Sequence, residues 1–290
     1  MRMAEIKERL IEYFVEFNAI SIIIVLVAIF LFIGFTGLKF FTNVNPLDFF
    51  LHVEWNPSAG EWGVINLLVG TLLVAVGALG FAVPLGIASA IFLSKIAGER
   101  VRGVLKPLIE MIAAIPSVVV GTFGFLFLVP LMAGLPGITS GLNVLTASIL
   151  VGFMALPTII SISDDALSSV PKSYEEASYA LGATKWETIK NVTVPGAKSG
   201  IVASLMLGFG RAVGETMVVL MVAGNVRAFP TSLLDPVRPM TANIAMEVGE
   251  VAKGSIHYQG LFAIGTLLFV ITFGVNTLGD WIIHRGVGPE

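Results

Sequence analysis

Residues 64–93 read VINLLVGTLLVAVGALGFAVPLGIASAIFL and contain no charged side chain. A helix needs roughly 20 apolar residues to cross a bilayer, because each residue advances it by about 1.5 Å through about 30 Å of hydrocarbon. Backbone N–H and C=O groups in that layer must bond to each other, which an α-helix achieves. The stretch is long enough to cross at a tilt, and Pro84, which has no N–H, favours a bend. It therefore predicts a transmembrane helix.

Five further stretches share this apolar character. They are residues 19–35, 108–132, 144–163, 200–222 and 260–283. Hydrophobic residues make up 56% of the chain and charged residues 13%, against about a quarter charged in soluble domains. Long continuous apolar runs are typical of helices, whereas barrel strands alternate. We predict an all-α membrane protein with about six transmembrane helices.

Charge placement predicts the organisation of the chain. Most of the 17 lysines and arginines lie in the amino-terminal tail, after the second and fourth apolar stretches, and at the carboxyl end. Since cytoplasmic loops carry an excess of Lys and Arg, we expect a multi-pass protein of the cytoplasmic (inner) membrane with both termini in the cytoplasm. No cleavage site follows the first apolar stretch, which should stay as an anchor.

These expectations divide the chain into segments. Residues 1–18 are predicted to be a cytoplasmic segment and residues 19–40 the first transmembrane helix. Residues 64–283 form a predicted core of five transmembrane helices, with a cytoplasmic loop at 164–199 and an outer loop at 223–258.

Glycine is abundant, with 31 residues, and small residues let membrane helices approach closely. Two ladders repeat every four residues: Ala82, Gly86 and Ala90 in the second stretch, and Ser204, Gly208, Ala212 and Thr216 in the fifth. Both predict contact faces, either within this chain or against a second subunit.

The polar connection 164–199 is longer than most links between membrane helices. Ser173 and Glu176 have the spacing of a capping box, so a helix should begin near Tyr174. Gly182 suits the left-handed residue that ends a helix. The spacing predicts a short first helix at the cytoplasmic face.

A second helix should follow directly. Thr184 and Glu187 repeat the capping-box spacing, and Pro195 should close a helix over about 185–192. The two together predict a helical hairpin, which either binds a partner or rests on the membrane surface.

The hairpin resembles the EAA motif of ABC importer permeases, in residues that share its spacing. They are Glu176, Ala177, Ser178, Gly182, Val192 and Pro195. The resemblance implies the type I importer permease (MetI-like) fold, with cytoplasmic coupling helices that insert into a separate ATPase subunit. The chain has no Walker-type phosphate loop of its own, so energy would come from that partner. We therefore expect a transporter subunit that is not itself an enzyme.

Two charged residues interrupt the fifth apolar stretch. Arg211 lies about 16 Å along a helix counted from Gly200, where an ionised side chain costs several kcal/mol. In one continuous helix Glu215 would share its face and could pair with it. Arg211 could form bidentate hydrogen bonds to a tetrahedral oxyanion. Glu215 could accept a hydrogen bond from a ligand that still carries a proton. The alternative is an ion pair that only fixes helix packing.

The sequence GRAVGETM at 210–217 resembles the permeases of inorganic oxyanion importers, and among them the PstC family of phosphate permeases. The segments IPSVVVG at 115–121, LP at 156–157 and DA at 165–166 share this resemblance. It implies an anion path that includes Arg211, Glu215 and Thr216. Implied partners are a sister permease (PstA-like), two ATPase subunits (PstB-like) and a phosphate-binding protein (PstS-like), besides membrane lipid. Neither nucleic acid nor a cofactor is implied.

Few other residues suggest chemistry. The chain has no cysteine, and His52, His257 and His284 are too scattered to bind a metal, so each is interpreted as an isolated surface histidine. Asp164 and Asp165 are interpreted as solvated or bonded to the loop.

Three other functions remain open from the sequence. The first is a permease for sulfate, molybdate or tungstate, which would keep Arg211 and gain little from Glu215. An intramembrane enzyme acting on lipid phosphates would need a nucleophile or acid that is not evident near Arg211. A secondary transporter or channel would leave the EAA-like loop unexplained.

Overall fold

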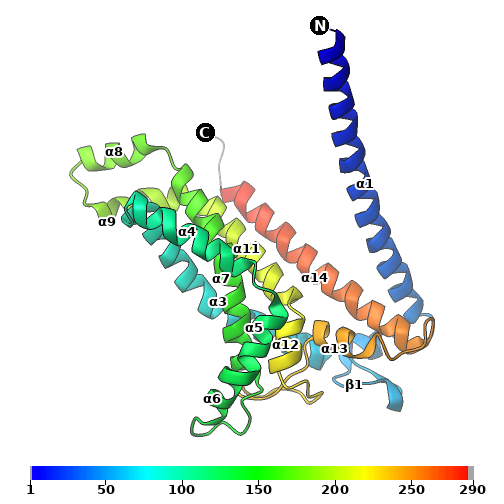
Figure 1. Ribbon diagram of the computed structural model, residues 1–290. Helices are drawn as coiled ribbons and strands as arrows, with labels where there is room; N and C mark the ends of the chain where they lie inside the picture. Colours follow the sequence, from blue (N-terminus) through cyan, green and yellow to red (C-terminus); the bar gives the residue numbers. More distant parts are fainter. Residues whose placement is uncertain (1, 287–290) are drawn as a thin grey trace.

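The computed structural model describes residues 2–286, which are almost entirely helical (Figure 1). The elements in chain order are α1 (Arg2–Phe40), α2 (Pro46–Leu51), β1 (Trp55–Asn56), β2 (Glu61–Trp62), α3 (Ile65–Ile91), α4 (Glu99–Ala113), α5 (Ser117–Phe123), α6 (Val129–Ala133), α7 (Val144–Ser169), α8 (Lys172–Ala180), α9 (Lys185–Thr188), α10 (Val194–Gly196), α11 (Lys198–Gly214), α12 (Met217–Val222), α13 (Met240–Glu247) and α14 (Ile256–Gly286). Wider π-helical turns over Phe92–Ile96, Gly124–Leu128 and Ile189–Thr193 extend or join helices. The all-α prediction is confirmed.

Four helices are long and apolar enough to cross a bilayer. They include Ile11–Phe40, Ile65–Ile96, Val144–Ser169 and Ile256–Gly279. Two bent pairs, Glu99–Ala113 with Ser117–Ala133 and Lys185–Gly196 with Lys198–Gly214, could each supply one more span. The described chain thus has between four and six spans, in line with the six apolar stretches of the sequence.

The helix expected over 108–132 is divided in two. Its halves meet at 89°, at a break around Pro116. The residue before a proline is disfavoured in helical conformation, and Pro116 itself is extended at ψ 136°. Consequently α4 does not continue the span and lies across the direction of α5.

The helix expected over 200–222 is also interrupted. α11 ends at Gly214, Glu215 is extended at ψ 131°, and α12 begins at Met217. Prediction of one continuous helix here was wrong, and the break falls among the residues assigned to the anion path.

The core forms where α3, α7 and α11 pack together, as Figure 1 shows. Ile159 of α7 is fully buried between two glycines. A Cβ atom at Gly86 of α3 would lie 2.7 Å from Ile159 Cγ2, and one at Gly208 of α11 would lie 2.9 Å from Ile159 Cδ1. The small-residue faces of α3 and α11 therefore serve close packing inside this chain.

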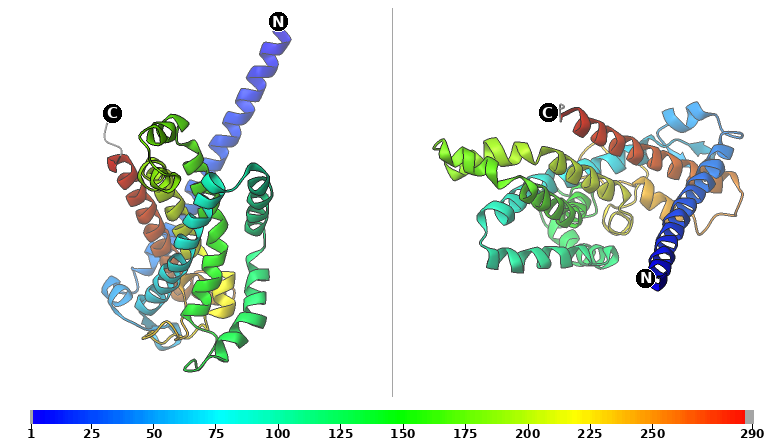
Figure 2. Two further views of the ribbon diagram at one scale, coloured as in Figure 1. Left: turned by 90° about the vertical axis from the view of Figure 1, so that its left-hand side faces the viewer. Right: turned by 90° about the horizontal axis from the view of Figure 1, so that it is seen from above.

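α1 packs differently from the other long helices. Its carboxyl half lies against α14, while its amino-terminal part extends away from the bundle (Figures 1 and 2). None of the most apolar part of Ile11–Phe40 is buried within the chain. The amino end of α1 and the carboxyl end of α14 lie at the same end of the molecule as α8 and α9 (Figure 1).

The opposite end is organised by aromatic side chains. Phe40, at the end of α1, packs edge-on against Phe49 and Trp62 with ring centroids 5.6 and 5.4 Å apart. Trp55 of β1 pairs with Trp62 of β2 and is fully buried. These contacts fix the β1–β2 hairpin beside α13 and α14.

Candidate functional site

Arg211 is half-buried on α11 and lines a cavity of about 690 Å³. The cavity lies between α1, α11, α13 and α14, and its other lining side chains are mostly apolar. Arg211 Nη1 also donates a long hydrogen bond of 3.4 Å to Thr158 Oγ1 of α7. The guanidinium thus lies among membrane helices with a single hydroxyl as its described hydrogen-bond acceptor.

Glu215 does not pair with Arg211 in the described structure. Because the helix breaks at Glu215, the one-turn spacing no longer brings the two side chains to one face. Glu215 Oε1 instead accepts backbone hydrogen bonds from Thr216 and Val218, each 3.1 Å long, and so caps the start of α12. Thr216 Oγ1 donates to the Gly214 carbonyl at 3.3 Å. The expected pairing was therefore wrong, while the role of these residues in an anion path stays a prediction.

The loop at 164–199 forms the expected hairpin, with two corrections. α8 starts at Lys172 after Pro171, without a side-chain cap, so the capping box expected from Ser173 and Glu176 does not form. The following helix does not stop before Pro195. It runs to Gly196, because the π-helical turn Ile189–Thr193 bonds Val194 N–H to the Ile189 carbonyl, one residue further back than in an α-helix.

Two details of the hairpin were predicted correctly. Gly182 has φ +86°, a left-handed conformation that few other residues adopt. Thr184 and Glu187 form a complete capping box at the start of α9. The Thr184 side chain and N–H both bond to the Glu187 carboxylate, which lowers the pKa of that group. The turn between α8 and α9 is thereby fixed.

The EAA-like residues fall into an inner and an outer set. Ser178 bonds to Thr188 Oγ1 at 2.9 Å and ties the two helices together, and Val192 is partly buried. Glu176, Ala177, Gly182 and Pro195 are exposed. Beside them, large apolar side chains also face outward: Leu181 is 89% exposed, Trp186 60% and Tyr174 55%.

An ion pair fastens the hairpin to the membrane core. Lys95, in the π-helical turn that extends α3, lies 2.6 Å from Glu175 Oε1 of α8. The same carboxylate oxygen accepts a hydrogen bond from Thr193 Oγ1 at 3.1 Å. α8, the end of α3 and the segment before α11 are therefore linked through Glu175.

A second charged cluster joins α4 to α7. Asp164 is fully buried and accepts from Arg102 at 2.9 Å and from Lys106 at 3.0 Å. Asp165 lies 2.5 Å from Lys106. Its hydrogen bond, followed by those of Asp164, raises the pKa of Lys106 against the opposing effect of burial. Of the two interpretations given for these aspartates, solvation was wrong for Asp164. Its carboxylate is hydrogen-bonded instead, to partners that precede it by 58 and 62 residues.

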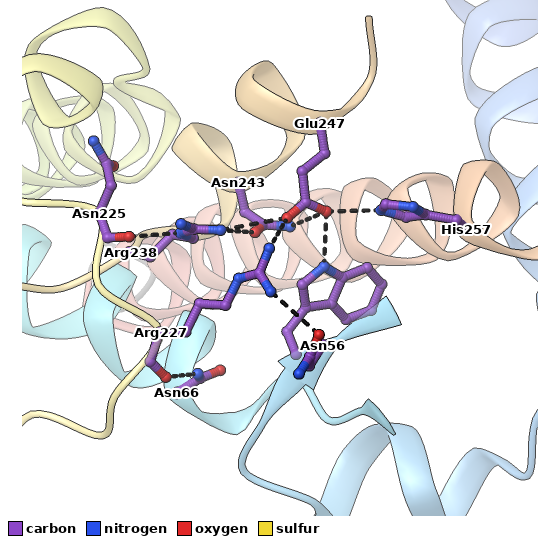
Figure 3. A network of polar contacts seen from close by, with 9 residues as sticks. Asn56, Asn66, Asn225, Arg227, Arg238, Asn243, Glu247 and His257 are labelled. Atoms are coloured by element: carbon purple, nitrogen blue, oxygen red, sulfur yellow. Dashed lines mark hydrogen bonds and ion pairs between the residues drawn. The ribbon is translucent and has the colours of Figure 1, made fainter. Parts of the chain in front are cut away.

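A third cluster lies at the opposite end and centres on Glu247, the last residue of α13 (Figure 3). Arg227, Arg238, His257 and Trp55 all contact its carboxylate. His257 is therefore not an isolated surface histidine, as the sequence suggested, because its Nε2 lies 2.8 Å from Glu247 Oε2. The one sequence signal for this cluster is the presence of Arg227, Arg238 and Glu247 in the predicted outer loop 223–258. The side chain of His284 lies outside the described residues.

Known transport proteins are similar to this chain over most of its length. Residues 82–285 match the family described as binding-protein-dependent transport system inner membrane component. The probable ABC transporter permease protein YqgH of Bacillus subtilis is 39% identical over 94% of this chain and 88% of its own. Phosphate transport system permease proteins PstC are also similar. That of Haemophilus influenzae is 36% identical over 82% of this chain and 81% of its own, and that of Pasteurella multocida 34% over 93% and 89%.

Solved structures share the fold at lower identity. An inward-facing MetNI methionine ABC transporter chain aligns with TM-score 0.57 and 19% identity over 78% of this chain and 95% of its own. A chain of a bacterial alginate ABC transporter aligns with TM-score 0.64 and 15% identity over 94% of each chain.

Proposed function

The chain belongs to the family of inner-membrane components of binding-protein-dependent transport systems, and we propose that it forms half of the pore of an ATP-driven importer of inorganic phosphate. Its fold is that of the type I ABC importer permeases, and it is PstC-like in sequence. Residues 64–283 act as the permease core, and residues 1–18 lie in the cytoplasm. Both termini and the hairpin share the cytoplasmic side.

The exposed apolar side chains of the hairpin support binding of an ATPase subunit there. Leu181, Trp186 and Tyr174 are exposed on the two-helix hairpin. The hairpin protrudes beyond the bundle (Figure 2). Large exposed apolar side chains surrounded by polar ones mark a protein interface, because burying them against a partner removes apolar surface from water. A separate ATPase subunit occupies this surface and hydrolyses the ATP, and Glu176, exposed on α8, contacts it directly.

The anion path contains Arg211, with Glu215 and Thr216 at the break between α11 and α12. A guanidinium with one weak described hydrogen bond has donors left for an oxyanion. The carboxylate of Glu215 lies one residue beyond the helix end, where a change in the break would bring it toward an anion held by Arg211. A PstA-like sister permease completes the pore, two PstB-like ATPase subunits drive it, and a PstS-like protein delivers phosphate from outside.

Uptake of radiolabelled phosphate tests the proposal. The chain is reconstituted in vesicles with its sister permease, ATPase and binding protein, and ATP-dependent uptake is compared among wild type, Arg211→Ala and Glu215→Gln. Arg100→Ala, which removes an exposed cation at the start of α4, is the matched control. Loss of uptake in the first two variants, with the complex still assembled and the control active, supports the path.

Competition among anions tests the substrate. Excess unlabelled phosphate should abolish uptake, while sulfate, molybdate and tungstate should not. Uptake of labelled sulfate or molybdate, with no uptake of labelled phosphate, would contradict the substrate and leave the transporter class intact. Uptake without ATP or without the ATPase would contradict the class.

A further inference from the structure

Four hydrogen-bond donors converge on the Glu247 carboxylate at the end of the molecule opposite the hairpin (Figure 3). Arg227 Nη2 and Arg238 Nη1 lie 3.2 and 3.3 Å from Oε1. Trp55 Nε1 and His257 Nε2 lie 2.9 and 2.8 Å from Oε2. A carboxylate offers about four lone-pair sites, so these four groups fill it completely. The Asn243 side-chain amide lies beside the same carboxylate, 3.5 Å from Oε2.

Positive charge in the cluster exceeds negative charge. Arg227 and Arg238 carry two charges, and Glu247 is the carboxylate paired with them in the described structure. Burial, and next the charge of Arg227, lower the pKa of Arg238, while Glu247 opposes them. The site therefore has an uncompensated cation, and a second negative charge would relieve it.

The cluster is open on one side. The Arg227 side chain is 41% exposed, whereas that of Arg238 is 12% exposed, so one guanidinium faces solvent and the other lies beneath it. Glu247 ends α13, and the turn that follows contains Gly249, where an added Cβ atom would meet nothing within 4 Å. The carboxylate thus lies at the end of α13, beside a turn that has free space around Gly249.

We propose that this cluster is a second oxyanion site, at the outer face, in which the Glu247 carboxylate takes the place of the anion when none is bound. A tetrahedral oxyanion of the phosphate class has four oxygens and bears the charge that the two arginines lack. It would accept from Arg227, Arg238, Trp55 and His257, while Glu247 leaves its donors. The proposal of this site rests on the chemistry of these donors and does not depend on the role proposed for Arg211.

Direct binding tests the site. The purified chain in detergent free of phosphate is equilibrated by dialysis with radiolabelled inorganic phosphate, without binding protein or ATPase. Glu247→Gln removes the competing charge and keeps a side chain of the same shape, so it should bind phosphate about ten-fold more tightly than wild type. Glu250→Gln, which removes an exposed acid three residues along the same turn, should bind as wild type does.

Further variants make the result decisive. Arg238→Gln added to Glu247→Gln should abolish the gain, whereas Arg211→Ala in that background should leave it. Equal binding by Glu247→Gln and wild type would make the cluster a structural latch only, and loss of the gain with Arg211→Ala would assign the binding to the membrane site. Either result overturns the proposal.

Two further cases are misfolding of Glu247→Gln and tighter binding of another anion. If Glu247→Gln does not fold, Arg227→Gln decides, since Arg227 is the more exposed of the two arginines, at 41%. Binding weaker by about ten-fold supports the site, and unchanged binding overturns it. Tighter binding of sulfate than of phosphate by Glu247→Gln would support the oxyanion site while contradicting phosphate as the transported anion.

Discussion

Lys95 Nζ lies 2.6 Å from Glu175 Oε1 and so joins the end of α3 to α8, the first helix of the hairpin. Their side chains are only 12% and 19% exposed, which makes the pair stronger than a surface ion pair. The contact gives movement of the hairpin a direct route to a membrane helix, besides the chain connection through α11.

Breaking this pair should uncouple the transporter. Glu175→Gln leaves Lys95 charged in a poorly hydrated place, a loss of about 2 kcal/mol for a charged hydrogen bond. We expect ATP hydrolysis to persist while phosphate uptake per ATP falls several-fold. Glu99→Gln, which removes an exposed acid at the start of α4, is the control. Equal loss of hydrolysis and uptake would mean that Glu175 only holds the ATPase in place.

Asp164 should be important for stability. Asp164→Asn removes the charge that neutralises Arg102 and Lys106, and breaking a buried pair costs about 3–5 kcal/mol. The thermal unfolding midpoint of the detergent-purified chain should fall markedly. Asp165→Asn, whose side chain is 67% exposed, should lower it far less. Similar midpoints for the two variants would show that burial of Asp164 is not decisive.

Gly86 should tolerate no side chain. Gly86→Leu would force a Cβ atom to 2.7 Å from Ile159 Cγ2, and overpacking of a core costs about 1–3 kcal/mol. The expected result is a lower unfolding midpoint and reduced uptake. Gly80→Leu, in the same helix at a position with nothing within 4 Å, should leave both unchanged. Sensitivity at Gly80 instead would point to a face covered by another subunit.

The α8–α9 turn should depend on one capping box. Thr184→Ala removes the side-chain bonds to Glu187, and loss of a helix cap costs about 1 kcal/mol. Hydrogen exchange in α9 should become faster and co-purification of the ATPase weaker. Ser173→Ala provides the control, because its capping box does not form. Faster exchange in both variants would mean that exposure, and not the cap, governs the hairpin.

Local patterns predicted the parts of this molecule that local chemistry determines. Apolar runs located the spans, and the spacing of Thr184 and Glu187 located the start of α9. The break at Glu215 was missed because GETM is compatible with a helix. The bonds found there, from the Thr216 and Val218 N–H groups to the carboxylate and from Thr241 to the Glu215 carbonyl, depend on the folded chain.

Long-range pairs could not be read from one sequence. Trp55 and Glu247 are 192 residues apart, and Lys106 and Asp164 are 58 residues apart. Nothing in the residues around His257 shows that a carboxylate from α13 will meet it. Such clusters depend on how helices assemble, so the sequence could supply their members and not their contacts.

The exposed surface of α1 affects how its sequence can evolve. From Ile22 to Leu26 the side chains of this helix are 56–61% exposed, so contacts within the chain impose no particular shape on them. Ile, Leu, Val and Phe are nearly interchangeable at such positions, because each keeps the helix apolar over the length that a span requires. Mutations should accumulate there with little selection from the rest of the chain, whereas Ile159, wedged between two glycines, should drift slowly. If exposed positions of α1 are conserved despite this freedom, their conservation would indicate contact with a neighbouring subunit.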